Sequence, residues 1–274
     1  MKKTPLFLLA FAVAIPQSAY AQESTESGRP DTKKGWQVTL SAGSIYAPNY
    51  RGDDDYQLGV FPGVAVEYDD LFFASIRGVG FNLINSDGLK AGPIMKYDFG
   101  RDEDGKGPFS LSGGTTDLIG LGDVDGTFEL GGFVEYSTGN ISGKVELRQG
   151  INGHEGLQGE AQVKYANRFK AFGKNAILSV GPEISFGDSK YNSAYFDVSA
   201  VQSAASGLSQ YDASGGLNSY GLGASIVLPM TRHITIVGLA GYQRLAGDIA
   251  KSSLVQERGS KDQASVGLIL NYRF

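Results

Sequence analysis

The side chains that catalysis usually requires are scarce in this chain. It contains two histidines, His154 and His233, and no cysteine, so acyl-transfer chemistry would have to combine a serine with one of these histidines. The strained Gly-x-Ser-x-Gly turn that presents such a serine does not occur in the sequence. His154 stands between Gly153 and Gly156, which predicts a turn residue, and His233 follows a second predicted turn at 229–232. We therefore predict that the protein is not an enzyme.

Two acidic runs contain the oxygen ligands that divalent cations prefer, Asp53–Asp55 and Asp102–Asp104. Three adjacent side chains do not converge easily on one ion, and neither run has the alternating spacing of a calcium loop. We expect both runs to be solvated loops, the first of them bridging to lipopolysaccharide through Mg²⁺. The segment Gly120-Leu121-Gly122 does not predict a phosphate site, because no helical pattern follows it. The sequence thus predicts neither a cofactor nor a resident metal.

A larger set of charged residues stands at alternate positions within otherwise apolar segments. If the apolar face of each segment contacts lipid, these residues face the inside of a barrel, where opposite charges on adjacent strands attract. We expect them to form a charge network in a narrow or plugged lumen. The predicted network comprises Glu67, Lys96, Asp98, Glu129, Glu135, Lys144, Glu146, Arg148, Glu160, Lys164 and Glu183.

The elements that would position these residues are strands, because apolar and polar residues alternate with a period of two along most of the chain. The segments have about the 9–11 residues that a tilted transmembrane strand needs. Aromatic residues near their ends are typical of interfacial girdles: Trp36, Tyr68, Tyr97, Tyr136, Tyr165, Tyr220, Tyr242 and Tyr272. Eleven segments are visible, at 35–46, 57–69, 70–83, 88–99, 126–137, 140–150, 157–168, 175–187, 217–230, 232–246 and 262–274.

Bacterial single-chain barrels have an even number of strands, so a twelfth segment is needed. The candidates are 108–119 and 194–201, and the alternative is a barrel of ten strands. The fold class predicted is therefore all-β, an antiparallel transmembrane β-barrel of about 12 strands. The tight turns would lie on the periplasmic side, and the long loops, including 188–216 and 247–261, would lie outside the cell.

Both ends of the chain carry export signals. Residues 1–21 combine Lys2 and Lys3, a short apolar run and the sequence Ala19-Tyr20-Ala21, which predicts a signal peptide cleaved between Ala21 and Gln22. Residues 22–34 are polar and are expected to form a flexible periplasmic leader, followed by one barrel domain at 35–274. The last strand ends on Tyr272 and Phe274 and resembles the closing strand of outer-membrane barrels, in which this pattern is the signal for the insertion machinery.

The composition agrees with a barrel and excludes other classes of protein. The chain has 39 glycines, a slightly negative mean hydropathy and a formal net charge of −5. An acidic chain without clustered Lys and Arg is not expected to bind nucleic acid. The partners expected from a membrane barrel are outer-membrane lipid, lipopolysaccharide and the barrel insertion machinery.

Six short motifs in order resemble the MltA-interacting protein family, also called MipA/OmpV. They are Tyr50-Arg51-Gly52-Asp53, Gly120-Leu121-Gly122-Asp123-Val124-Asp125, Tyr195-Phe196-Asp197-Val198, Tyr211-Asp212-Ala213, Tyr242-Gln243-Arg244-Leu245 and Tyr272-Arg273-Phe274. The chain departs from the family pattern at Asp197, where a glycine is common, and at Lys251–Val255.

The resemblance covers essentially the whole mature chain and implies a protein of the Gram-negative outer membrane. It also implies, from one member, a scaffold that joins a murein lytic transglycosylase to a bifunctional peptidoglycan synthase. The alternative function is a narrow channel for small solutes, which would use the charged lumen and the outer loops.

Overall fold

The computed structural model describes residues 35–76, 78–107, 109–111 and 114–274. The predicted signal peptide, its cleavage site at Ala21 and Gln22, and the leader lie outside these residues. The strands are β1 (Trp36–Pro48), β2 (Tyr56–Tyr68), β3 (Phe72–Ser75), β4 (Gly78–Phe81), β5 (Ile84–Ser86), β6 (Leu89–Asp98), β7 (Thr127–Thr138), β8 (Ile141–Gly150), β9 (Leu157–Ala171), β10 (Lys174–Gly187), β11 (Gly216–Pro229), β12 (Ile234–Leu245) and β13 (Asp262–Arg273). The helices are α2 (Ser189–Phe196), α3 (Ala200–Ser206), η1 (Ile249–Lys251) and α4 (Ser253–Arg258).

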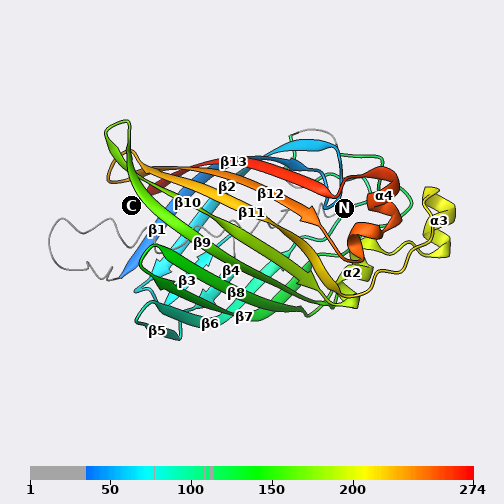
Figure 1. Ribbon diagram of the computed structural model, residues 1–274, viewed down its shortest axis with the longest axis horizontal. Helices are drawn as coiled ribbons and strands as arrows, with labels where there is room; N and C mark the ends of the chain where they lie inside the picture. The colour runs from blue at the N-terminus through cyan, green and yellow to red at the C-terminus, as the bar shows by residue number, and fades with distance from the viewer. Residues whose placement is uncertain (1–34, 77, 108, 112–113) are drawn as a thin grey trace, which may run out of the picture.

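The strands form one closed antiparallel sheet (Figure 1). Apart from β4 and β5, consecutive strands are neighbours. β1 pairs with β13 over eight register positions from Thr39↔Arg273 to Tyr46↔Val266, and β4 pairs with β6, which closes the wall. β4 and β5 both pair with β6 in nearly the same register, so they form one interrupted strand. The described residues therefore make a barrel of twelve strands, as predicted.

Both candidates for the twelfth strand were wrong. Residues 194–201 belong to the end of α2 and the start of α3. Among the described residues of the segment 108–119, a short stretch pairs with β2: Val60 N donates to Phe109 O at 2.9 Å and Leu111 N to Leu58 O at 3.0 Å. The additional strand comes from the expected segment 70–83, which folds back on itself as the short β3–β4 hairpin.

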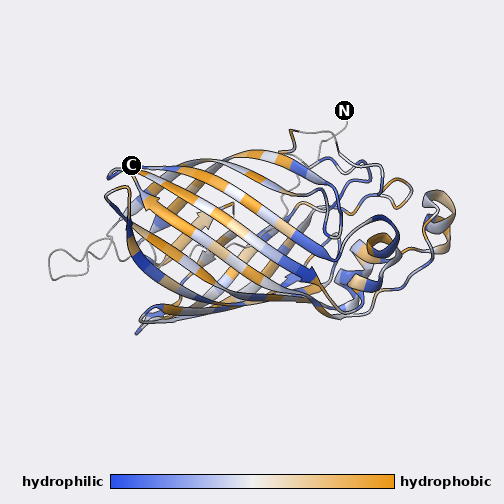
Figure 2. Cartoon of the chain, turned by 45° about the horizontal axis from the view of Figure 1, so that its top comes forward, coloured by the Kyte–Doolittle hydropathy of each residue, from blue (hydrophilic) through white to orange (hydrophobic). Residues whose placement is uncertain are grey.

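The outer surface of the barrel is apolar and has an aromatic girdle at each end. Figure 2 shows hydrophobic and hydrophilic residues alternating along the strands. The predicted aromatic residues are on the outer face, and further aromatic pairs occur there, such as Tyr46 with Tyr56 and Tyr97 with Phe128. On β1, ten residues separate Trp36 from Tyr46, which corresponds to about 25 Å along the barrel axis at a tilt of about 40°. This is the thickness of the apolar band of outer-membrane barrels.

The two ends of the barrel differ strongly. One end, here called the turn end, carries the tight turns at 69–71, 139–140, 172–173 and 230–233, and β13 ends there. The other end, the loop end, carries all the long connections and helices α2, α3 and α4 (Figure 1). The expected loops 188–216 and 247–261 thus contain short helices. None of the described helices is long and apolar enough to cross a membrane.

The connections at the loop end pack into a cap with two apolar clusters of its own. The first cluster contains Tyr50, Leu118, Leu121, Val198, Leu208 and Leu254. The second contains Phe196, Ala213, Leu245, Ile249, Ala250 and Val255. Because residues from four connections and from the end of β12 share these clusters, the cap is a packed layer over the barrel end.

Candidate functional site

Charged side chains of β7, β8 and β9 meet on the inner face of the barrel around Arg148. Its Nε donates to Glu129 Oε2 at 2.8 Å and its Nη2 donates to Glu160 Oε1 at 3.1 Å. Its Nη1 donates to Glu146. Arg148 is 1% exposed, so its charge depends on these three carboxylates rather than on water.

Two lysines complete this network. Lys96 Nζ of β6 lies 2.5 Å from Glu146 Oε1, and Lys144 Nζ lies 2.8 Å from Glu146 Oε2. The network, defined as these two lysines with Arg148 and its three glutamates, contains three cations and three carboxylates. Formal charge is therefore balanced within one patch of the inner wall, as buried ion pairs require.

The structure brings together six of the eleven residues predicted to face the lumen. Of the other five, Asp98 lies beside Glu129, and Lys164 is buried on β9. Glu183 accepts a hydrogen bond from Gln243 Nε2 at 2.7 Å. Glu135 is opposite Lys90 and Lys144 in the strand registers, and Glu67 is opposite Gln37. These residues take the alternate positions expected, but they do not all join one network.

His154, expected to be a simple turn residue, extends the network toward the loop end. It lies in the turn between β8 and β9, but its ring is buried. Its Nε2 lies 3.0 Å from Glu129 Oε1, and its Nδ1 accepts the Gly156 N–H at 3.0 Å. Gln158 Nε2 donates to the same Glu129 oxygen. Sequence reasoning missed this residue, because nothing in a turn segment indicates that the turn folds inward.

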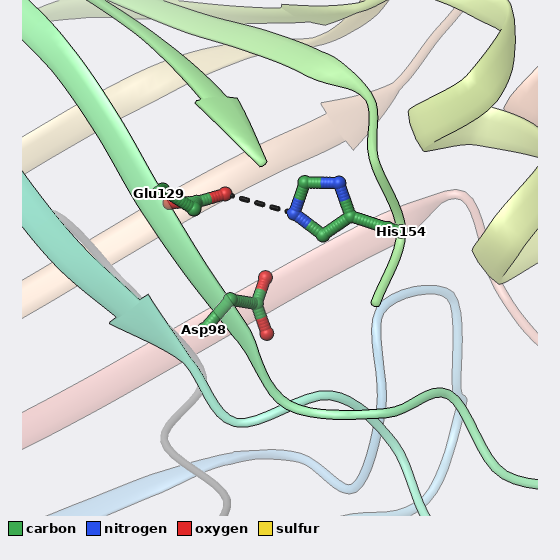
Figure 3. A group of neighbouring side chains, drawn as sticks. All are labelled: Asp98, Glu129 and His154. Carbon is green, nitrogen blue, oxygen red and sulfur yellow. Dashed lines mark hydrogen bonds and ion pairs between the residues drawn. The ribbon is translucent and has the colours of Figure 1, made fainter. Parts of the chain in front are cut away.

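Asp98, Glu129 and His154 have ligand atoms within 4.8 Å of one another, which raises the question of a metal site (Figure 3). A histidine that binds a metal normally donates its other ring N–H to a neighbour. Here the Nδ1 of His154 is instead an acceptor for a backbone N–H, so the neutral ring carries its proton on Nε2. That nitrogen then donates to Glu129 and has no lone pair for a metal. The geometry supports a hydrogen-bonded network.

The acidic run at Asp53–Asp55 differs from the expected solvated loop. Asp53 is fully buried, while Asp54 and Asp55 are exposed. Asn49 Nδ2 donates to Asp53 Oδ2 at 2.9 Å, and the backbone N–H of Asp55 donates to Oδ1 at 3.0 Å. Burial raises the pKa of Asp53 to about 6 in spite of these hydrogen bonds. Asp117 approaches the same carboxylates, so this group organises the loop between β1 and β2.

Arg51 of the β1–β2 loop reaches across the bore. Its Nη2 donates to Ser185 Oγ of β10 at 2.6 Å and to Ser219 Oγ of β11 at 3.2 Å. In the wall, β10 is separated from β1 by β13, β12 and β11. A side chain that starts above β1 and ends on β10 therefore spans the interior at the loop end.

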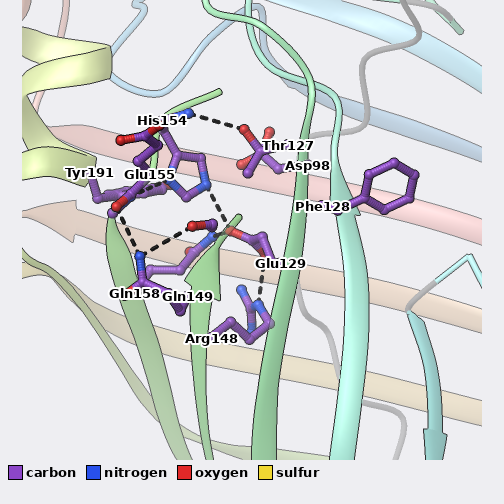
Figure 4. A network of polar contacts seen from close by, with 12 residues as sticks. Asp98, Thr127, Phe128, Glu129, Arg148, Gln149, His154, Glu155, Gln158 and Tyr191 are labelled. Carbon is purple, nitrogen blue, oxygen red and sulfur yellow. Dashed lines mark hydrogen bonds and ion pairs between the residues drawn. The ribbon is translucent and has the colours of Figure 1, made fainter. Parts of the chain in front are cut away.

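Helix α2 contributes aromatic rings to the same layer (Figure 4). The ring of Tyr191 lies with its centroid 5.0 Å from that of His154 and 5.1 Å from that of Tyr195. Burial raises the pKa of both tyrosines, so their phenols stay neutral. Arg101 Nη1 donates to the backbone oxygen of Tyr195 at 2.6 Å and fixes the end of the helix. Arg51, His154, Tyr191 and Tyr195 together form what we call the inner plug.

The two histidines lie at opposite ends of the barrel and have different partners. The ring of His154 contacts a carboxylate and a backbone N–H, as described, and His233 Nδ1 lies 2.8 Å from the backbone oxygen of Arg273. The His233 ring stacks on Tyr272 with centroids 5.8 Å apart, and Tyr272 contacts Phe274 at 5.0 Å. The predicted insertion residues thus form an exposed aromatic group at the turn end.

Residues 40–274 match the model of the family described as MltA-interacting protein MipA. The outer membrane protein OmpV of Vibrio cholerae is 26% identical over 275 residues, with both chains covered completely.

Solved structures resemble the barrel more distantly. The COG4313 outer membrane channel of Pseudomonas putida F1 has a TM-score of 0.45 and 10% identity, covering 91% of this chain and 100% of the other. The outer membrane protein OprD of Pseudomonas aeruginosa has a TM-score of 0.35 and 12% identity, covering 86% of this chain and 65% of the other. The family match extends over the whole barrel described above, with its apolar outer face and aromatic girdles. The chain therefore belongs to the MltA-interacting protein MipA family and is an antiparallel β-barrel of the outer membrane.

Proposed function

We propose that this barrel is a non-enzymatic binding protein that holds murein-processing enzymes at the periplasmic face of the outer membrane. In this role it is a scaffold between a murein lytic transglycosylase and a peptidoglycan synthase. The observation that carries the proposal is the inner plug beneath a packed cap. A barrel whose loop end is filled in this way is suited to present surfaces rather than to pass solutes.

The charge chemistry of the interior supports the same conclusion. In a channel, charged side chains on the wall attract or repel passing ions. Here Arg148, Glu129 and Glu146 are almost completely buried and satisfy one another. Charged groups that are buried and paired with one another interact only weakly with a passing solute. The interior is therefore better explained as a stabilising core of the barrel.

The partner class comes from the family. Its description names an interaction with MltA, and we extend that interaction to this chain as binding of a murein lytic transglycosylase. Because the number of strands is even, the start of β1 and the end of β13 lie at the same end of the barrel, which is the turn end. The predicted leader at 22–34 would join β1 there, so we assign the turn end to the periplasm, where such an enzyme acts.

Two measurements test the proposal. Cross-linking in intact cells, followed by isolation of the barrel, is expected to recover a murein lytic transglycosylase, and a β-barrel of unrelated family is the control. In planar bilayers the purified protein is expected to give currents well below those of a general porin, and the Arg51→Ala/Tyr191→Ala variant is expected to conduct more. Large, steady currents from the unaltered protein, or the absence of any murein enzyme after cross-linking, would overturn the proposal.

A further inference from the structure

The hairpin formed by β9 and β10 extends past the neighbouring strand β8 at the turn end. The pairing of β8 with β9 stops at Ile141↔Tyr165, whereas β9 continues to Ala171. β9 is the longest strand, with 15 residues, and β10 begins at Lys174. Figure 1 shows this hairpin standing out from the wall at the end where the chain terminates.

The height of the projection places its tip beyond the lipid. Tyr165 is on the outer face, half exposed, at the aromatic girdle of the turn end. Seven residues separate Tyr165 from Phe172, which is about 18 Å along the axis at 3.3 Å per residue and a tilt of about 40°. The headgroup layer on each side of a bilayer is only about 6 Å thick. The tip therefore lies in the aqueous compartment, and contact with lipid does not explain its composition.

The residue at the tip is unusual for its backbone conformation. Phe172 and Gly173 have φ values of 52° and 73°, the two positive values of a type I′ turn. Asn, Asp and Gly are favoured at the first of these positions, because the left-handed region is strained for other residues. The Asp69 and Asp87 positions of other turns at this end follow that preference. Phe172 does not, and its side chain is 92% exposed.

Positive charge surrounds this exposed ring. Lys170 and Lys174 flank the turn and are exposed, and Arg168 follows on the same strand. Among the ion pairs of the described residues, neither Lys170 nor Lys174 takes part. Phe169 adds a second half-exposed ring. An exposed, strained aromatic residue with three cationic residues beside it has the composition of a binding hot spot with a charged rim.

We propose that this tip, residues 169–174, is the docking site for an acidic surface of a periplasmic protein, with the Phe172 ring inserted into an apolar pocket of that partner. The inference rests on the proposed function, since the scaffold role places the partner at the turn end, and it names the surface that the partner contacts. Opposite charge selects the partner and speeds the encounter. The aromatic ring provides the affinity, as buried aromatic residues do at protein interfaces.

The test uses a photo-reactive amino acid introduced at Phe172 of the full-length protein in living cells. The matched control is the same amino acid at Met230, which is exposed at a neighbouring turn of the same end. We expect a strong cross-link from position 172 to a protein, mapped by mass spectrometry to an acidic segment, and little from position 230. Adding Lys170→Glu/Lys174→Glu is expected to reduce this cross-link at least tenfold, whereas Lys190→Glu/Lys251→Glu at the loop end leaves it unchanged.

A second variant distinguishes loss of binding from misfolding. Phe172→Asn replaces the strained residue by one favoured in a type I′ turn, so it is expected to fold at least as well and to lose co-isolation of the partner. A cross-link to an acidic protein that is not a murein enzyme supports the docking site and contradicts the proposed function. Recovery of a transglycosylase that is indifferent to all tip variants overturns the docking site alone. Cross-links to lysozyme-sensitive murein, to the leader of this chain, or to no protein also overturn it.

Discussion

Replacing Arg148 by methionine would remove the central cation of the inner network while keeping much of its volume. The change leaves Glu129 and Glu146, both nearly fully buried, with one cation fewer, and the network with a net charge of −1. Removing one partner of a buried ion pair costs about 3–5 kcal/mol. Glu146 keeps Lys96 and Lys144, so we expect a loss of free energy of unfolding near the lower limit, about 3 kcal/mol.

The assay is urea unfolding of the refolded barrel in lipid vesicles, followed by tryptophan fluorescence and by gel mobility. The control is Arg244→Met, because Arg244 forms a comparable pair with Asp262, at 2.5 and 2.7 Å, that is exposed. An exposed pair contributes only about 0–1 kcal/mol. In a double-mutant cycle, Glu129→Gln combined with Arg148→Met is expected to show a coupling of more than about 1 kcal/mol. Equal losses for the two arginine variants would refute the network as a stabilising core.

Further predictions concern pH, orientation and closure of the wall. The pKa of Asp53 is raised to about 6 in the folded protein from 3.8, so the folded state binds the proton more tightly than the unfolded state does. The free energy of unfolding should therefore fall by about 2–3 kcal/mol as the pH rises from 4 to above 6. Calorimetry of the Asp53→Asn variant should show no such fall. The chain has no cysteine, so single cysteines can report the orientation of the barrel. Val201 is 79% exposed on α3, and Val201→Cys should react with an impermeant maleimide on intact cells, whereas Phe172→Cys should react only after the outer membrane is opened. The reverse pattern would invert the assigned topology. Unboiled protein should migrate faster than boiled protein on a detergent gel, because a closed sheet has no free edge from which to unravel, and identical mobility would contradict the closed barrel.

The strands were predictable wherever lipid faces one side of the wall and the interior faces the other. The segments that became β7, β8 and β9 show this alternation clearly, and their predicted bounds differ from the structure by at most three residues. Alternation failed at β3 and β4, since both faces of this region are apolar and no run of polar residues marks the reversal between Ser75 and Gly78. The prediction of twelve strands was confirmed, although the twelfth came from this hairpin.

The cap and the inner plug were harder to predict. Helices α2 and α3 have eight and seven residues, too few for a helical period to stand out. The sequence does contain their start signals, Asp188 as an N-cap and the Ser199/Gln202 capping box, but such signals are frequent in loops. The inward position of His154 and the reach of Arg51 across the bore depend on distant segments. Local pattern alone carries no information about them.

The closure of the wall by β1 and β13 has a consequence for the folding kinetics. The register pairs that join these strands link residues more than 200 positions apart, whereas β9 and β10 are joined by a two-residue turn. Bringing such distant segments together costs about 5 kcal/mol of loop-closure entropy, and it is recovered only when several pairs form at once. Topologies dominated by contacts of this kind fold slowly. The hairpins can form early and locally, but the barrel remains an open sheet with two reactive edges until its first and last strands meet, so that step is expected to be the rate-limiting and most aggregation-prone stage of assembly.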